Sequence, residues 1–242
     1  MNLSSLATDY DGTLAEDGGV AKRTIRALES LRRSHRSMIL VTGRELAQLL
    51  EVFDRTDLFD WVVAENGAIL YHPATGTKRL LTAPVPLHFV EELRRRGVSP
   101  ISTGDVIVAT WRPHETTVLE VIRELGLELR ITLNKSAVMV LPIGVDKASG
   151  MEAALEEMSL SWTDVAGIGD AENDLAFLRK CRCSAAVSNA LGPVKMAVDF
   201  TTRAPRGEGV VELIDRILND DLQSHCDTRH ERATAVLSNT RS

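Results

Sequence analysis

The sequence has few cysteines, no long apolar run and no excess of basic residues. Its three cysteines, Cys181, Cys183 and Cys226, are odd in number and lack the spacing of a disulfide framework or of a complete zinc site. We therefore expect reduced thiols, as is usual in a cytosolic protein. No apolar run approaches the ~20 residues that a membrane-spanning helix requires, so no membrane partner is expected.

The first residues, Met1–Ala7, lack a basic region followed by a long apolar stretch, and they do not resemble a signal peptide. The formal net charge is −6, whereas a general nucleic-acid binder needs basic patches that neutralise backbone phosphates. The sequence thus predicts a cytoplasmic protein without a nucleic-acid partner. Nothing in it indicates an oligomeric state.

What the sequence does contain is an alternation of short apolar runs with amphipathic helical patterns, which is typical of βαβ units and a largely parallel sheet. The chain has 242 residues, 44% of them hydrophobic, which is enough for a sizeable core. The first strand is expected to end at Ala7, and further strands to cover 38–41, 61–64, 164–168 and 185–187. Helices are expected over 22–34, 45–53, 147–157, 174–180 and 210–218.

The middle of the chain has a different pattern, from about Pro84 to Pro142. A helix and strand segments are followed by a second helix and two more strands, an αββ-αββ order typical of a small α+β unit with an antiparallel sheet. The helices are expected over 87–96 and 115–125, and the strands over 106–111, 128–133 and 137–141. Because this unit interrupts a parallel sheet, we interpret it as an inserted lid that excludes water and selects the substrate.

The predicted architecture is therefore α/β. Residues 1–83 and 143–222 form a Rossmann-like core with a parallel sheet, and residues 84–142 form the inserted α+β cap. After Leu222 the composition turns polar and loses its apolar periodicity. Residues 223–242 are predicted to be a flexible tail or a linker to a further domain.

Two aspartates, Asp9 and Asp11, follow the first predicted strand. At positions i and i+2 they point the same way from the carboxyl end of that strand, which is where ligands bind in open α/β sheets. Carboxylates held so close repel one another and need a cation or a shared proton. Gly12 permits a sharp turn after them. An acidic turn at a loop tip has the same residues, so the pair alone does not decide between a turn and a catalytic loop.

Two further segments could bind an anion. Thr42-Gly43-Arg44 lies between a buried strand and a helix, where a hydroxyl and a flexible backbone form an anion cradle; a turn with helix capping has the same residues. Lys147 lies near the start of the helix over 147–157, where the helix dipole disfavours a cation. An anion sharing the site would make a lysine tolerable there, and a solvated lysine turned away from the helix end is the alternative.

The segment 167–174 again follows a short strand and opens a helix. Asp170 and Asp174 enclose Glu172 and Asn173 within about one helical turn, a density of oxygen ligands that suits Mg²⁺. N-capping with an acidic first turn is the alternative, and it is compatible with a metal role.

All four segments lie at or near the ends of predicted strands, so one parallel sheet would bring them to the same edge. Together they provide a nucleophile, an acid, a hydroxyl, a lysine and a metal site. That is a full set for phosphoryl transfer.

The order of these residues resembles that of the haloacid dehalogenase (HAD) superfamily: Asp9-x-Asp11-Gly12-Thr13, Thr42-Gly43-Arg44, Lys147 and Gly169-Asp170-x-x-Asn173-Asp174. Segments 65–68, 188–190 and 207–210 resemble its Cof-type branch, which inserts an αββ-αββ cap between the second and third motifs. The resemblance covers roughly residues 6–218. In size and layout the chain is most similar to archaeal-type phosphoglycolate phosphatases and sucrose-phosphate phosphatases.

The resemblance implies a Mg²⁺-dependent phosphatase that hydrolyses a small phosphorylated metabolite, a sugar phosphate or a phosphoglycolate-like ester, through an aspartyl-phosphate. Asp9 would be the nucleophile, and Asp11 the general acid and base. The ligands of Mg²⁺ would be Asp9, the backbone carbonyl of Asp11, Asp170 and Asp174. The phosphoryl oxygens would be held by Thr42, Gly43, Arg44, Lys147 and Asn173, with Asn189 in support.

Two cap residues, Arg112 and Lys135, are candidate contacts to an anionic group of the substrate, although such residues are common in surface loops. Three alternatives stay open. A phosphomutase of the same superfamily would use the same motifs but return the phosphoryl group to a second hydroxyl. A response-regulator receiver is much shorter and has no cap. A non-catalytic regulatory domain that binds a phosphorylated ligand is disfavoured because the acidic residues and Lys147 are intact.

Overall fold

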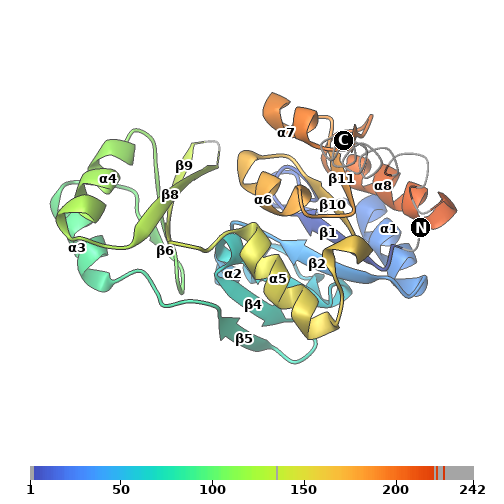
Figure 1. Ribbon diagram of the computed structural model, residues 1–242, viewed down its shortest axis with the longest axis horizontal. Helices are drawn as coiled ribbons and strands as arrows, with labels where there is room; N and C mark the ends of the chain where they lie inside the picture. Colours follow the sequence, from blue (N-terminus) through green and yellow to red (C-terminus); the bar gives the residue numbers. More distant parts are fainter. Residues whose placement is uncertain (1–2, 135, 221, 223–225, 227–242) are drawn as a thin grey trace, which may run out of the picture.

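The computed structural model describes residues 3–134, 136–220, 222 and 226. Within them, one sheet has eight strands in the order β12-β11-β10-β1-β2-β3-β4-β5, and a second sheet has four strands in the order β6-β7-β9-β8. Figure 1 shows the smaller sheet, with helices α3 and α4, set apart from the rest of the molecule. The mixed α/β class that the sequence predicts is confirmed.

The larger sheet is parallel over six of its strands, and its central strand carries the first acidic residue. Strand β1 (Ser5–Asp9) is buried along its whole length and pairs in parallel with β2 (Ser37–Val41) and β10 (Val165–Gly169). The outer parallel strands are β3 (Trp61–Ala64), β11 (Cys183–Ala186) and β12 (Phe200–Thr201). All six parallel strands thus direct their carboxyl ends to one edge of the sheet.

Amphipathic helices cover this sheet. Helix α1 (Lys22–Arg33) buries Thr24, Leu28 and Leu31 and packs against α8 (Arg206–Asp220), while α5 (Lys147–Met158) packs on β2 and β3. The remaining helices of this part are α2 (Leu46–Val52), α6 (Leu175–Leu178) and α7 (Gly192–Ala197). Within the part of the chain that the structure describes, no helix is long and apolar enough to cross a membrane.

The smaller sheet has the predicted order of elements, helix-strand-strand repeated once. Its elements are α3 (Leu87–Arg95), β6 (Ser102–Thr103), β7 (Val108–Trp111), α4 (Glu115–Glu124), β8 (Leu129–Asn134) and β9 (Ala137–Pro142). All neighbouring strands in it are antiparallel. It has its own hydrophobic core, centred on Phe89, Leu93, Val118 and Val138. We call residues 84–142 the cap, and we propose that these are the bounds of the inserted domain.

Several details of the larger sheet differ from the prediction, among them the short edge strand β12, which was not predicted. Strand β1 does not end at Ala7, because Thr8 and Asp9 still pair with Leu40 and Val41 of β2. An antiparallel hairpin, β4 (Ile69–His72) and β5 (Thr77–Leu80), extends the sheet beyond β3 and was not predicted. All four residues of β5 are exposed, so the apolar alternation that marks a strand is missing there.

The cysteines also differ from the prediction. Cys183, at the start of β11, forms a disulfide with Cys226, 43 residues later. The expectation of three reduced thiols is therefore wrong for this pair. Cys181 is free and buried, and burial raises the pKa of its thiol. Apart from Cys226, the predicted tail of residues 223–242 lies outside the described residues.

Candidate active site

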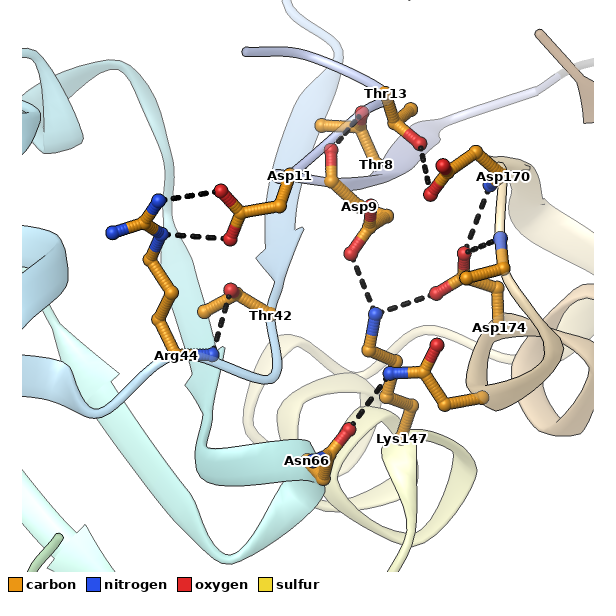
Figure 2. Close-up of polar contacts among 12 residues, drawn as sticks. Thr8, Asp9, Asp11, Thr13, Thr42, Arg44, Asn66, Lys147, Asp170 and Asp174 are labelled. Carbon is orange, nitrogen blue, oxygen red and sulfur yellow. Dashed lines mark hydrogen bonds and ion pairs between the residues drawn. The ribbon is translucent and has the colours of Figure 1, made fainter. Parts of the chain in front are cut away.

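The four predicted segments meet at the carboxyl edge of the larger sheet, as Figure 2 shows. Asp9 comes from the end of β1, the Thr42–Arg44 loop follows β2, Lys147 opens α5, and Asp170 to Asp174 follow β10. Segments that are far apart in the sequence are thereby brought within hydrogen-bonding distance of one another.

Lys147 lies at the centre of this arrangement. Its Nζ donates to Asp9 Oδ1 and to Asp174 Oδ1, both at 2.5 Å. Lys147 is 1% exposed, Asp9 4% and Asp174 0%, so these charges are removed from water. The alternative of a solvated lysine is thereby excluded, and the lysine instead links the ends of β1 and β10.

Burial and charge act on these groups in opposite directions. Burial, followed by the charge of Asp174, raises the pKa of Asp9 well above its ordinary value, and the ammonium of Lys147 lowers it in part. Burial lowers the pKa of Lys147, but Asp174 and Asp9 more than offset this, so its pKa lies above the ordinary value. Lys147 therefore stays protonated, and further positive charge nearby would favour the ionised form of Asp9.

Three carboxylates are placed so that one cation could supply that charge. Asp9, Asp170 and Asp174 are all buried, and each has one oxygen within 4.8 Å of an oxygen of the other two. Lys147 offsets only part of their combined charge. Carboxylate oxygens are the ligands that Mg²⁺ prefers, so this donor set fits a divalent cation.

Asp174 also holds the loop that carries Asp170. Its Oδ2 accepts hydrogen bonds from the backbone amides of Asp170 and Ala171, both at 2.9 Å. The predicted helix over 174–180 is shorter than expected: the 3₁₀ turn η4 (Glu172–Asp174) precedes α6, which covers Leu175–Leu178. The capping bonds thus come from Asp174 and not from Asp170 as an N-cap, and a metal role for this segment stays a proposal.

Asp11 points away from this cluster and is paired with Arg44. The guanidinium donates from Nε to Asp11 Oδ2 at 2.7 Å and from Nη2 to Oδ1 at 2.6 Å. Such a bidentate pair fixes the plane of the carboxylate. Arg44 was expected to contact the phosphoryl group, but in this structure its guanidinium is engaged with Asp11.

The predicted phosphate-binding residues lie beside the acidic cluster. Thr42 is fully buried, and its hydroxyl accepts the backbone amide of Arg44 at 3.0 Å. Asn173 donates from Nδ2 to Asn66 Oδ1 at 2.9 Å, while its Oδ1 is buried without a partner among the described residues. Asn66 also faces Gly43, because a Cβ added to Gly43 would lie 3.3 Å from the Asn66 amide group.

The start of α5 is set by an unusually close backbone contact. A Cβ added to Gly67, whose φ is +100°, would lie 1.9 Å from the carbonyl oxygen of Asp146. Asp146 caps α5 by accepting the amide of Ser149 at 2.9 Å, and the Ser149 hydroxyl accepts the amide of Asp146. These contacts hold Lys147, the first residue of α5, where it reaches Asp9.

A cleft of about 250 Å³ lies between this site and the cap. Its core side includes Asp9, Asp11, Arg44, Glu45 and Gln48, and its cap side includes Ser102, Ile107, Trp111, Asn134 and Met139.

The three remaining predicted residues are Arg112, Lys135 and Asn189. The guanidinium of Arg112 pairs with Glu115 at 3.1 Å and does not line the cleft. Lys135 lies outside the described residues. Asn189 contacts the loop after Asp11, where its side-chain amide donates to the carbonyl of Gly12 at 2.8 Å.

Two residues of this region were not assigned a role from the sequence. Glu65 and Asn66 belong to η2 (Glu65–Gly67), directly after β3, and both are buried polar residues with positive φ. A non-glycine residue with positive φ is uncommon. In the sequence, segment 65–68 shows only a resemblance to the Cof-type branch. The left-handed backbone of two adjacent residues cannot be predicted from their residue types.

The fold and the acidic cluster together define a hydrolase of the HAD type, and comparison with known proteins agrees. The family model of haloacid dehalogenase-like hydrolases matches residues 6–97 and 130–214. A phosphoglycolate phosphatase of Methanothermobacter thermautotrophicus is 28% identical over 222 residues, covering 89% of this chain and 99% of that protein. One of Nitrosopumilus maritimus is 29% identical over 231 residues, covering 90% and 97%.

A solved haloacid dehalogenase-like hydrolase from Bacteroides thetaiotaomicron has the same fold, with a TM-score of 0.76, 19% identity, and coverage of 89% of this chain and 100% of that one. The chain belongs to the haloacid dehalogenase-like hydrolase family. It is an enzyme of the phosphoric monoester hydrolase class, as its relatives are.

Proposed function

We propose that the protein is a Mg²⁺-dependent phosphatase that hydrolyses a small phosphate monoester through an aspartyl-phosphate on Asp9. The observation that carries this proposal is the contact of Asp9 with Lys147 beside two further buried carboxylates. A carboxylate in a buried site, with a lysine to hold a phosphoryl oxygen, is suited to attack phosphorus. Water would then hydrolyse the intermediate and release inorganic phosphate.

The residues of the chain have separate tasks in this reaction. Asp9 attacks with its carboxylate, and Asp11 gives a proton to the leaving alcohol and later takes one from the attacking water. Lys147, Thr42 and Asn173 hold the phosphoryl oxygens. Asp9, Asp170 and Asp174 would hold Mg²⁺, which when bound supplies positive charge against the phosphate and the carboxylates.

The substrate is proposed to be a small phosphorylated metabolite. The named relatives are phosphoglycolate phosphatases, which supports a phosphoglycolate-like ester. The cleft also has neutral polar groups in Gln48, Ser102 and Asn134, which suit the hydroxyls of a sugar phosphate. Phosphate release from phosphoglycolate and from a set of sugar phosphates tests the two; isomerisation of a sugar phosphate without phosphate release would instead indicate a phosphomutase. The proposed location is the cytoplasm.

Mg²⁺ is expected to stabilise the protein as well as to activate it. Because the ligands are assembled only in the folded state, saturating Mg²⁺ at about 100 times its Kd adds roughly 2.7 kcal/mol, which raises Tm by about 5–10 °C for a chain of this size. Thermal melts with and without EDTA measure this. Asp170→Asn should lose most of the shift, and Asp17→Asn, in an exposed loop, should keep it. An unchanged melt with Mg²⁺ would contradict the metal site.

Asp11→Asn is expected to slow hydrolysis in proportion to how poor the leaving group is. Asparagine cannot donate the proton that an alkoxide requires, a contribution of about 10²- to 10⁴-fold. p-Nitrophenolate leaves without a proton, so p-nitrophenyl phosphate should be affected much less than an alkyl phosphate. The ratio of kcat/KM for the two esters is the measurement. An equal loss on both would remove Asp11 from the role of general acid.

A further inference from the structure

Glu65 connects the larger sheet with the cap through its side chain. It is fully buried, and its carboxylate accepts three backbone amides of the cap: Asp105 at 2.9 Å on Oε1, and Val106 at 2.8 Å and Ile107 at 3.0 Å on Oε2. All three donors lie in the turn between β6 and β7. One carboxylate thus satisfies three consecutive amides of another part of the molecule.

The cap turn is shaped around this carboxylate. A Cβ added to Gly104 would lie 2.5 Å from Glu65 Oε1, and its three nearest atoms would all belong to the Glu65 carboxyl group. The amide of Gly104 donates to the carbonyl of Ile107 at 2.9 Å and closes the turn. No side chain larger than hydrogen fits at position 104 without moving Glu65.

The backbone of Glu65 is fixed to the catalytic side. Its amide donates to the carbonyl of Arg44 at 2.9 Å, and the next amide, of Asn66, donates to the carbonyl of Thr42 at 3.0 Å. Glu65 therefore runs from the loop proposed to hold the phosphoryl group to the turn of the cap.

The cap turn in turn positions one wall of the cleft. Ile107 lines the cleft itself, and Ser102 and Ala109, which also line it, are paired with each other across β6 and β7. Displacing the turn would move this wall relative to Asp9 and Asp11. The Glu65 side chain does not line the cleft but accepts hydrogen bonds from the cap turn, so a change in this side chain is expected to act on the substrate mainly through the cap.

We propose that Glu65 is a positioning residue. It fixes the distance between the cap and the catalytic carboxylates, and it thereby determines how the leaving group is bound. This rests on the proposed phosphatase function. Glu65→Gln replaces one acceptor oxygen by an amide that faces backbone N–H groups. Gly104→Ala disturbs the same contact from the cap side, where glycine has no positive φ and only the added methyl group acts.

The kinetic test compares a substrate that reaches the cap with one that does not. For p-nitrophenyl phosphate, which has a bulky aromatic leaving group, both variants should lower kcat/KM by about 10- to 100-fold, mainly through KM. For acetyl phosphate, which is smaller, kcat/KM should stay within about threefold of wild type. Equal losses on both substrates would show a disturbed catalytic centre and would overturn the proposal, as would no loss on either.

Hydrogen exchange gives a readout that does not depend on activity. The amides of residues 105–107 should exchange about tenfold faster or more in Glu65→Gln, while those of β9 keep their protection. Unchanged exchange at 105–107 would overturn the proposal. A wild-type protein that releases no phosphate from any ester would instead overturn the phosphatase function, and exchange alone would then decide whether Glu65 holds the cap.

Lys78→Met is the matched control. Lys78 reaches the same cap turn from β5, with its Nζ 2.7 Å from Asp105 Oδ2, but its side chain is 40% exposed. Exposed ion pairs contribute little to stability. The kcat/KM values of this variant for p-nitrophenyl phosphate and for acetyl phosphate should therefore both stay within about twofold of wild type. If Glu65→Gln does not fold, Gly104→Ala alone decides, because it disturbs the same contact while residue 65 stays a glutamate.

Discussion

Asp9→Asn is expected to abolish phosphate release from p-nitrophenyl phosphate, with kcat falling by roughly 10⁴- to 10⁶-fold. Asparagine has nearly the same shape as aspartate but no nucleophilic oxygen anion. The fold should persist, because burial and Asp174 already disfavour the charged form of Asp9. Removing that charge therefore should not lower the Tm of the metal-free protein. Phosphate release and thermal melts in EDTA measure the two effects.

Asp17→Asn serves as the control for this experiment. It makes the same chemical change in an exposed loop eight residues further along the chain, and kcat should stay near that of wild type. A mass increase of one phosphoryl group on a peptide that contains Asp9, trapped during turnover, would give direct evidence of the intermediate. If Asp9→Asn kept kcat within tenfold of wild type, the assignment of the nucleophile would be wrong.

Lys147→Met is expected to reduce both stability and activity. It leaves Asp9 and Asp174 buried and facing each other without a cation, which typically costs about 3–5 kcal/mol. It also removes the proposed donor to the phosphoryl group, for a further expected loss of about 10²- to 10³-fold in kcat. Urea unfolding of the metal-free protein at neutral pH and steady-state kinetics with Mg²⁺ report on the two losses separately.

The stability loss in Lys147→Met should depend on pH with a defined sign. Lys147 lowers the pKa of Asp9 in the wild type, so its removal raises that pKa further above the unfolded value of about 3.9. A raised folded pKa contributes stability that is complete below about pH 3.9 and is lost as pH rises through the folded pKa. The unfolding free energy of the variant should thus continue to fall up to a higher pH than that of wild type.

Lys180→Met is the matched control for Lys147→Met. Lys180 pairs with Glu152 at 3.1 Å, but the two side chains are 46% and 52% exposed. Its loss should change the unfolding free energy by no more than about 1 kcal/mol. If Lys147→Met unfolded at the same urea concentration as wild type, Lys147 would not be the charge that stabilises the two carboxylates.

Parallel strands β2 and β3 could be predicted because they are continuous apolar runs. Strand β3 has the predicted bounds, Trp61–Ala64, and every residue of β2 beyond Ser37 is buried. Hairpin β4–β5 could not be predicted in the same way. Its outer strand, Thr77–Leu80, forms the edge of the sheet with no buried face, so the composition of β5 resembles that of a loop.

The site could be predicted where one residue type implies one chemistry. Asp9, Asp170 and Asp174 are predicted from their positions after strands and Lys147 from the start of a helix, and the structure brings their side chains together. The pairing of Arg44 with Asp11 was not foreseen, because a basic residue after a strand can contact either a phosphate or a carboxylate. Only the geometry of the two loops decides between these partners.

The contacts of Glu65 and the disulfide are the features furthest from the reach of sequence reasoning. Glu65 meets the cap turn 40 residues away, and Cys183 meets Cys226 43 residues away. Neither pair belongs to a repeated spacing or an amphipathic pattern. Such contacts follow from how the larger sheet, the cap and the C-terminal segment are placed in space, and that placement is a property of the whole chain.

The distance along the chain between Asp9 and Lys147 has a consequence for the synthesis of the protein. The two residues are 138 positions apart, so at about 5–20 residues per second the ribosome needs roughly 7–30 s to add the lysine after the aspartate. Strand β1 can pair with its neighbour β10 only after β10, which follows Lys147 in the chain, has been synthesised. A nascent chain that ends before α5 thus contains Asp9 without Lys147, and the proposed site is assembled only after Asp174 has been added.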